Sequence, residues 1–274
     1  MAETTRSISQ IHDAAAPTDT TAEFEQLQAA LQLMFDKVAA RFELERDPST
    51  EEFEHYSAPG PDDAEGPSGQ IRGYTGPEMD WLIHSWMGVP GSGFTNLHLT
   101  AWLGPHTMVP HFGMAWGTLP DYWYFVDYIP RVDLLTNYDY LQRYYGVHNQ
   151  QYMALRDEGG FSPFVSQNLL IRQSVSNTAL CFVCERTPQG AARMIELADG
   201  RLDDWLGFLD DGDPTPATER AALAERDLLV RSTIAEKDPA NNMGVRFFGE
   251  EMTDRLVKAL WGGNRVLPRP TGDL

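Results

Sequence analysis

Residues 95–117 read TNLHLTAWLGPHTMVPHFGMAWG, and their pattern is that of two strands joined by a turn. In its first half, leucine and alanine alternate with polar or aromatic side chains, which is the period of a strand with one face in a core. Gly104 and Pro105 then mark a turn, and the alternation resumes at Val109. The pattern predicts a β-hairpin with strands over 95–103 and 109–117.

The register of this hairpin brings polar and very small side chains to one face. If Gly104 pairs with Val109, His98 lies opposite Ala115 and Trp102 opposite His111. Glycine inside a strand often marks close approach by a ligand or by another backbone. The face is therefore either the floor of a cleft for a flat ligand, or a seat for a helix with His98 as a satisfied, half-buried histidine. Its members are Asn96, His98, Thr100, His111, Gly113, Ala115 and Gly117.

The rest of the chain predicts a single α+β domain. Strands in consecutive hairpins followed by helices indicate a mostly antiparallel sheet. Residues 1–20 are expected to form a flexible arm, and 21–274 one domain with an acidic loop at about 47–69. The predicted helices are Thr21–Arg46, Asn137–Tyr145, Pro216–Lys237 and Gly249–Trp261. A further strand is predicted over Tyr122–Ile129. Two more segments are predicted as strands or as strand–helix joins, Ser166–Arg172 and Thr178–Glu185.

The composition argues against several classes of partner. The formal net charge is −19 and the pI about 4.6, so neither nucleic acid nor an anionic membrane is a favoured partner. No apolar run approaches the length of a membrane-spanning helix, and residues 1–21 have no apolar signal core. Two cysteines give no disulfide framework. We expect a cytoplasmic protein.

Three motifs suggest a nucleotide, redox or metal site, but their surroundings argue against each. The glycines of 88–93 precede a strand, whereas a dinucleotide fingerprint needs a following helix. Cys181 and Cys184 have redox or zinc spacing, but residues three apart on a strand face opposite sides, so two buried structural cysteines are favoured. The histidines of the hairpin form no metal-ligand pair, and no metal site is predicted.

Several segments, in order, resemble the red chlorophyll catabolite reductase and ferredoxin-dependent bilin reductase superfamily. The resemblance implies a sheet sandwiched between helices (an α/β/α sandwich), with the substrate between the sheet and the C-terminal helices. It also implies an oxidoreductase with no bound cofactor, in which a linear tetrapyrrole takes electrons from reduced ferredoxin and the protein supplies protons. The segments are 109–114, 126–134, 138–145, 162–172, 238–240 and 246–251.

The resemblance also assigns roles to individual residues. His98 and Asp238 match catalytic positions, and Asn242, one helical turn after Asp238, is expected to orient it. Arg131 and Arg172 are candidates for substrate propionates, because arginine pairs bidentately with carboxylates. Two plainer alternatives stay open: Arg131 as part of a structural ion-paired turn, and Asp238 as a helix-capping or turn residue. The remaining expected substrate contacts are Asn96, Thr100, His111, Gly113 and Ala115.

One departure keeps three functions open. Ala115 stands where the related enzymes carry an acid. The chain is thus interpreted as a ferredoxin-dependent reductase of C=C bonds in a bilin or chlorophyll catabolite, as a reductase of a non-tetrapyrrole intermediate, or as a pigment-binding protein without catalysis. Ferredoxins are acidic, so docking requires a basic patch. The candidates for it are Arg226, Arg231, Lys237, Arg246, Arg255 and Lys258.

Overall fold

The computed structural model describes residues 8–60 and 65–265, and its centre is one antiparallel sheet. Nine strands take part, in the order β1-β3-β4-β5-β6-β7-β9-β8, with β2 also paired to β3. The strands are β1 (Glu45–Arg46), β2 (Tyr56–Ser57), β3 (Ser68–Thr75), β4 (Met79–Val89), β5 (Phe94–Leu103), β6 (His111–Thr118), β7 (Tyr122–Ile129), β8 (Phe161–Pro163) and β9 (Leu180–Cys184).

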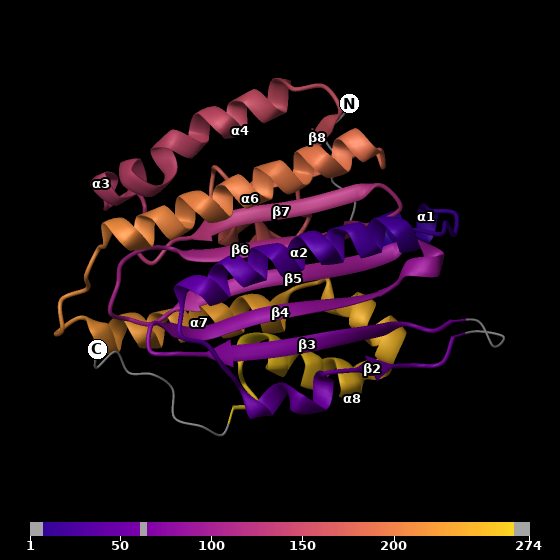
Figure 1. Ribbon diagram of the computed structural model, residues 1–274, viewed down its shortest axis with the longest axis horizontal. Coiled ribbons are helices and arrows are strands. Elements are labelled where there is room, and N and C mark those ends of the chain that lie inside the picture. Colours follow the sequence, from indigo (N-terminus) through magenta and orange to yellow (C-terminus); the bar gives the residue numbers. More distant parts are fainter. Residues whose placement is uncertain (1–7, 61–64, 266–274) are drawn as a thin grey trace.

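Helices cover both faces of the sheet, which confirms the predicted α/β/α sandwich. Figure 1 shows α2 (Thr21–Arg41) and α6 (Pro188–Asp211) on the near face, with α7 (Arg220–Lys237) and α8 (Asn241–Trp261) behind. Within the described residues, no helix is long and apolar enough to span a bilayer. The shorter elements are α1 (Ile8–Ala14), η1 (Pro48–Phe53), η3 (Pro90–Ser92), α3 (Tyr138–Leu141), η4 (Gln142–Gly146), α4 (Val147–Asp157) and α5 (Leu169–Ser174).

The two faces of the sheet are packed very differently. On the face under α2 and α6, apolar side chains at helical spacing meet the leucine face of the hairpin, and Leu27, Leu97 and Leu99 are completely buried. The opposite face carries a smaller apolar cluster centred on Trp81, Trp102 and residues of α8. The main hydrophobic core therefore lies on one side, and the other side retains polar side chains.

The register of the central hairpin is confirmed. His98 pairs with Ala115, and Thr100 pairs with Gly113. The second strand begins at His111 rather than at residue 109, because Pro110 has no N–H to donate to a ladder. At this end the Nδ1 atom of His111 accepts a hydrogen bond from the Leu103 N–H instead, at 2.9 Å.

Other boundaries differ from the sequence predictions. The first long helix ends at Arg41 because Phe42 is extended, and residues 45–46 form β1. Residues 169–174 form a helix capped by Asn168 rather than a strand. The sequence pattern did not predict β3, β4 or α6. The expected flexible arm contains α1, whose His12 and Asp13 contact α8.

Candidate functional site

A row of side chains crosses five strands on the face that carries α7 and α8. Ser85, His98, Ala115, Phe125 and Cys181 are successive cross-strand partners on β4, β5, β6, β7 and β9, and we call them the open row. His98, Phe125 and Cys181 are partly exposed, whereas the neighbouring leucines on the other face have no exposure. The helices over this face therefore leave the middle of the sheet incompletely covered.

His98 lies at the centre of the open row with small neighbours on both sides. Ser85 and Ala115 flank it, and among the residues that the structure describes it has no hydrogen-bond partner. Burial lowers the pKa of His98 to about 4, so the imidazole is neutral near pH 7. A neutral imidazole offers one N–H donor and one acceptor to a ligand.

The face of α7 toward the sheet ends in a carboxyl group. Asp227, Val230, Ile234 and Asp238 follow helical spacing along one stripe, and Val230 and Ile234 pack in the cluster under α8. Figure 1 shows α7 running along the strands. At 1.5 Å per residue, Asp238 lies about 16 Å beyond Asp227.

The open row lies at a matching distance along the sheet. Asp227 is fixed beside His111, with Oδ2 to Nε2 at 3.3 Å. From His111 to Ala115 the strand advances about 13 Å. From these two lengths we infer that the stripe on α7 ends, at Asp238, near the level of the open row.

The environment of Asp238 favours a protonated carboxyl group. The residue ends α7 with extended dihedral angles, and its Oδ1 accepts a hydrogen bond from the Ala240 N–H at 2.8 Å. Burial raises its pKa, and this backbone bond opposes the shift. The expected role of Asn242 is wrong, since Asn242 is exposed and only its backbone N–H, donating to Pro239, is engaged nearby.

A buried ion cluster fixes the other end of α7 and corrects two predicted substrate contacts. Asp227 Oδ2 accepts from Arg131 Nε at 2.9 Å and Nη2 at 2.6 Å. The Nη1 group of Arg131 donates to the carbonyls of Gly104 and Thr107. Arg131 is thus a buried structural residue, as in the alternative hypothesis of an ion-paired turn, and not a ligand for a substrate propionate.

His111 belongs to the same buried cluster and is therefore not accessible to a substrate. His111 is 1% exposed, and its Nδ1 accepts from a backbone N–H, so the proton of the neutral ring lies on Nε2, facing Asp227. Burial lowers its pKa to about 4. Burial would raise the pKa of Asp227, but His111 and Arg131 hold it below its usual range.

The small residues of the hairpin face are only partly accessible to a ligand. A side-chain atom added at Gly113 would meet Ile129 at 3.4 Å and Phe125 at 3.7 Å, so these side chains cover the glycine. Ala115 is 9% exposed, while Asn96 and Thr100 are partly exposed on the same face. A ligand on this face would contact Phe125 where a bare glycine was expected.

Arg172 remains accessible for an anionic group. It lies on α5, which packs beside α7, and its side chain is exposed. Its Nη1 group donates to the carbonyls of Ser166 and Gln167 at 2.9 Å, which orients the guanidinium.

The six cations predicted to form a basic patch do not form a continuous basic surface. Arg231 is 3% exposed and pairs with Asp80 at 2.7 Å, and Arg226 donates to Asp227 and to the Pro130 carbonyl. Arg246 and Arg255 are exposed but paired with Asp13 and Glu52. Among the described residues, only Lys237 and Lys258 of the six proposed cations are exposed without an ion pair.

The sequence reading missed four residues of this face. Ser85, Phe125 and Cys181 enter the open row only through pairings of β4, β7 and β9. Asp127 is buried beside it, and burial raises its pKa to about 6 against hydrogen bonds from Ser176. Alternation within β7 already placed Phe125 and Asp127 on a common face.

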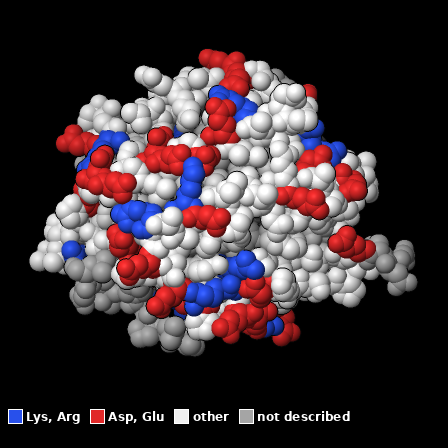
Figure 2. Space-filling model, viewed as in Figure 1, with Lys and Arg blue, Asp and Glu red and all other residues white. Residues whose placement is uncertain are grey.

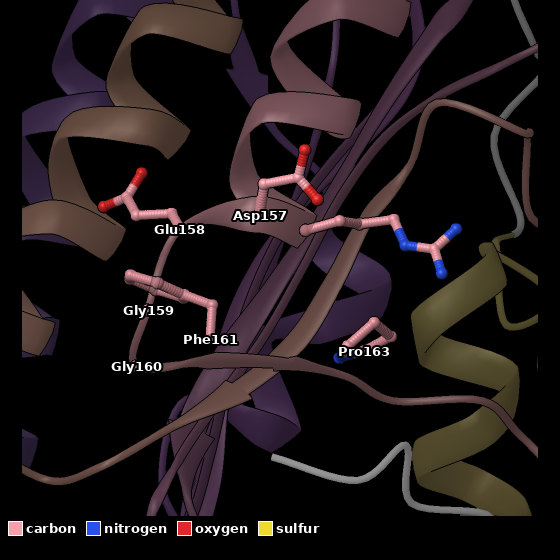
Figure 3. Close-up of a pocket in the computed structure, with 7 residues that line it drawn as sticks. Asp157, Glu158, Gly159, Gly160, Phe161 and Pro163 are labelled. Carbon is pink, nitrogen blue, oxygen red and sulfur yellow. The ribbon is translucent and has the colours of Figure 1, made fainter.

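A separate cavity lies away from these residues. It has a volume of about 320 Å³ at the turn between α4 and β8 and is lined by residues 156–161 and Pro163 (Figure 3). The carboxylates of Asp157 and Glu158 point in different directions there, and Glu158 pairs with Arg193. None of the predicted site residues lines this cavity.

A family model described as red chlorophyll catabolite reductase matches residues 30–261. The chain belongs to this family. Two plant reductases of the family are similar in sequence. The chain is 28% identical to red chlorophyll catabolite reductase 1, chloroplastic, of Oryza sativa subsp. japonica over 203 residues, 68% of this chain and 61% of the relative. It is 26% identical to the reductase of Hordeum vulgare over 194 residues, 65% of this chain and 94% of the relative.

The match to the rice relative concerns the length of the protein and its location. The match spans only 61% of its length. Its name places it in the chloroplast, which contradicts the cytoplasmic location expected from the sequence.

The fold of this family member is also found in a bilin-binding structure. The crystal structure of selenomethionine phytochromobilin synthase from tomato in complex with biliverdin matches with a TM-score of 0.70. The match covers 88% of this chain and 84% of the tomato chain at 19% identity, so it shows a common fold. The family model thus confirms the suspected relation to red chlorophyll catabolite reductases, and the tomato structure shows that the fold is shared with a biliverdin-bound protein.

Proposed function

We propose that this chain reduces a linear tetrapyrrole, a bilin or a chlorophyll catabolite, on the open row beneath α7 and α8. The proposal is carried by the partly exposed, neutral His98 on this row, together with the half-buried Asp238 carboxyl at the end of the helix that covers the same face. A binding surface needs no proton donor, whereas reduction of a C=C bond consumes two electrons and two protons.

In this proposal the substrate itself receives the electrons. A one-electron donor of the ferredoxin class supplies them in two steps. Asp238, whose pKa is raised by burial, supplies one proton to the reduced substrate, is reprotonated from solvent, and then supplies the second proton. His98 donates its N–H to a polar atom of the bound substrate and orients it. Exposed Arg172 is placed to bind a carboxylate side chain of the substrate.

Ala115 favours a second candidate, a pigment-binding protein without catalysis. The open row contains no carboxylate, because Ser85 and Ala115 flank His98. All proton supply would then rest on Asp238. Turnover separates the two candidates, since both require binding on the same face.

The experiment combines binding, location and turnover. Biliverdin is titrated into the purified protein while the visible spectrum and induced circular dichroism are recorded. Alkylation of Cys181 is followed by mass spectrometry with and without biliverdin, and Cys184, buried on the opposite face, is the internal control. Turnover is measured with a reduced ferredoxin system, and with NADPH alone.

We expect a spectral shift, protection of Cys181, and turnover with the ferredoxin system only. Binding with protection but no turnover would favour the non-catalytic candidate. No spectral change at tens of micromolar biliverdin, or efficient turnover with NADPH alone, would contradict the proposed reductase.

A further inference from the structure

The segment that carries Asp238 is joined to the rest of the molecule at two points that permit rotation. Asp238 ends α7, and the first part of α8, residues 241–248, follows directly. At Gly249 the helix is interrupted by φ 78 and ψ 168, a conformation that side-chain-bearing residues rarely adopt. Residues 241–248 are therefore a short helix of their own, which we call the hinge helix.

Asp238 is hydrogen-bonded to the start of the hinge helix. Its Oδ1 accepts from the Ala240 N–H, and its carbonyl accepts from the Asn241 N–H at 3.1 Å. The hinge helix contacts the body through Met243, Phe247 and Phe248, while Val245 and Arg246 face outward. A few contacts therefore decide where the Asp238 carboxyl lies.

The N-terminal helix α1 supplies one group of these contacts. Asp13 Oδ1 lies 2.8 Å from Arg246 Nη1. The His12 ring packs edge-on against Phe94 of β5 and Phe247 of the hinge helix, with centroids at 5.8 and 6.0 Å. One face of the hinge helix is thus held against the sheet through α1.

The chain after α1 is itself anchored to the sheet. The Thr20 N–H and hydroxyl both donate to the Pro90 carbonyl, and the Thr20 hydroxyl lies 3.1 Å from that of Thr118. A cavity of about 110 Å³ lies at the end of α1 and is lined by His12, residues 15–17, residues 92–93 and residues 119–120. Since the anchor is fixed, α1 acts as a short strap across the hinge helix.

We propose that Asp13 and Arg246 are positioning residues that hold the hinge helix, and with it Asp238, over the open row. The proposal rests on the proposed function for the role of Asp238. When the strap releases, the hinge helix rotates at Gly249, the face opens to substrate, and Asp238 becomes more exposed. Asp13 faces Arg246 of α8 and His12 of its own helix.

The test uses Asp13→Ala, Arg246→Ala, the double variant, and the exchanged pair Asp13→Arg with Arg246→Asp. Hydrogen exchange of residues 241–248 is measured without pigment, and association and dissociation rates are measured with biliverdin. The matched control is Glu196→Ala, which removes an exposed acid paired with Arg193 at 3.0 Å on the opposite face of the sheet.

An exposed ion pair changes such equilibria by about two- to five-fold. We expect each single variant to speed exchange in 241–248 and both biliverdin rates by that factor, and to lower kcat similarly. The double variant resembles either single variant, and the exchanged pair restores the parent. Because burial raises the pKa of Asp238, its exposure in the single variants shifts the basic limb of the pH–rate profile to lower pH.

Unchanged exchange in 241–248, additive effects in the double variant, or no recovery by the exchanged pair would overturn the proposal. The exchange measurement needs no substrate. If the Asp13 and Arg246 variants speed hydrogen exchange in 241–248 but the protein does not bind biliverdin, the proposed function is contradicted. If the protein binds and reduces biliverdin but these variants leave hydrogen exchange unchanged, the positioning role is contradicted.

Discussion

At the scale of single residues, one physical cause acts in opposite directions on the two groups of the site. Burial lowers the pKa of His98 to about 4 and raises that of Asp238. Both shifts favour the uncharged form, because a poorly solvated site disfavours charge of either sign. The candidate site thus combines a neutral hydrogen-bond donor on the sheet with a carboxyl group at the end of α7 that retains its proton to a higher pH than a solvated one.

Asp238→Asn should lower the reduction rate on the order of 100-fold while biliverdin still binds, because the shape is kept and the acid is lost. In the parent, the rate should fall as the pH rises through the raised pKa of Asp238, since the acid must be protonated. The variant should lack this limb. Steady-state rates against pH measure both effects.

The control is Asp254→Asn, an exposed carboxylate further along α8. A parent-like rate in Asp238→Asn would remove this carboxyl from the mechanism and leave its bond to the Ala240 N–H as its only role.

The sequence could predict the residues of the hairpin and not their neighbours. The opposition of His98 and Ala115 follows from local alternation and a short turn. The burial of His111 and Arg131 does not, because their partner Asp227 lies 96 positions from Arg131 along the chain. Ser85 and Cys181 were missed for the same reason, since strand order is a long-range property.

At the scale of elements, α7 is the part whose docking decides the site. Its first half is attached by the buried Arg131–Asp227 pair, and Arg231 pairs with Asp80 and lies 5.7 Å from the Trp102 ring. Its polar groups therefore attach its first half to the sheet, and in the proposed function the carboxyl group at its end supplies protons. Helical periodicity predicted the helix, but the stripe of Asp and Arg gave no local sign of burial.

Asp227→Asn should lower the free energy of unfolding by about 3–5 kcal/mol, because it leaves the buried Arg131 guanidinium without its counter-charge. The exposed pair Glu52–Arg255 gives a matched control, and Glu52→Gln should cost less than about 1 kcal/mol. Urea unfolding at pH 7 measures both. Equal losses in the two variants would mean that the buried cluster does not hold α7.

At the scale of the whole molecule, charge is dispersed rather than gathered. Figure 2 shows acidic and basic side chains interspersed on the face of α2 and α6, with acidic ones in excess. Most of the cations once grouped as a docking patch are buried or paired. A protein of net charge −19 would therefore repel an acidic electron donor overall.

The rate of reduction by an acidic ferredoxin should consequently rise several-fold as ionic strength increases, since salt screens this repulsion. Stopped-flow reduction of the biliverdin complex across a salt series measures it, with a neutral small-molecule reductant as the control. A rate that falls with salt would instead indicate attraction to a local patch around Lys237 or Lys258.

The margins of the sheet have a consequence for how copies of this protein behave together. One margin ends in β1 and β2, two residues each, and the other in β8, three residues that include Pro163. Such stubs present few free backbone groups to a neighbouring chain, and proline presents no donor. These margins therefore disfavour the addition of a strand from another molecule, and with it the edge-to-edge growth of the sheet when many copies are crowded together.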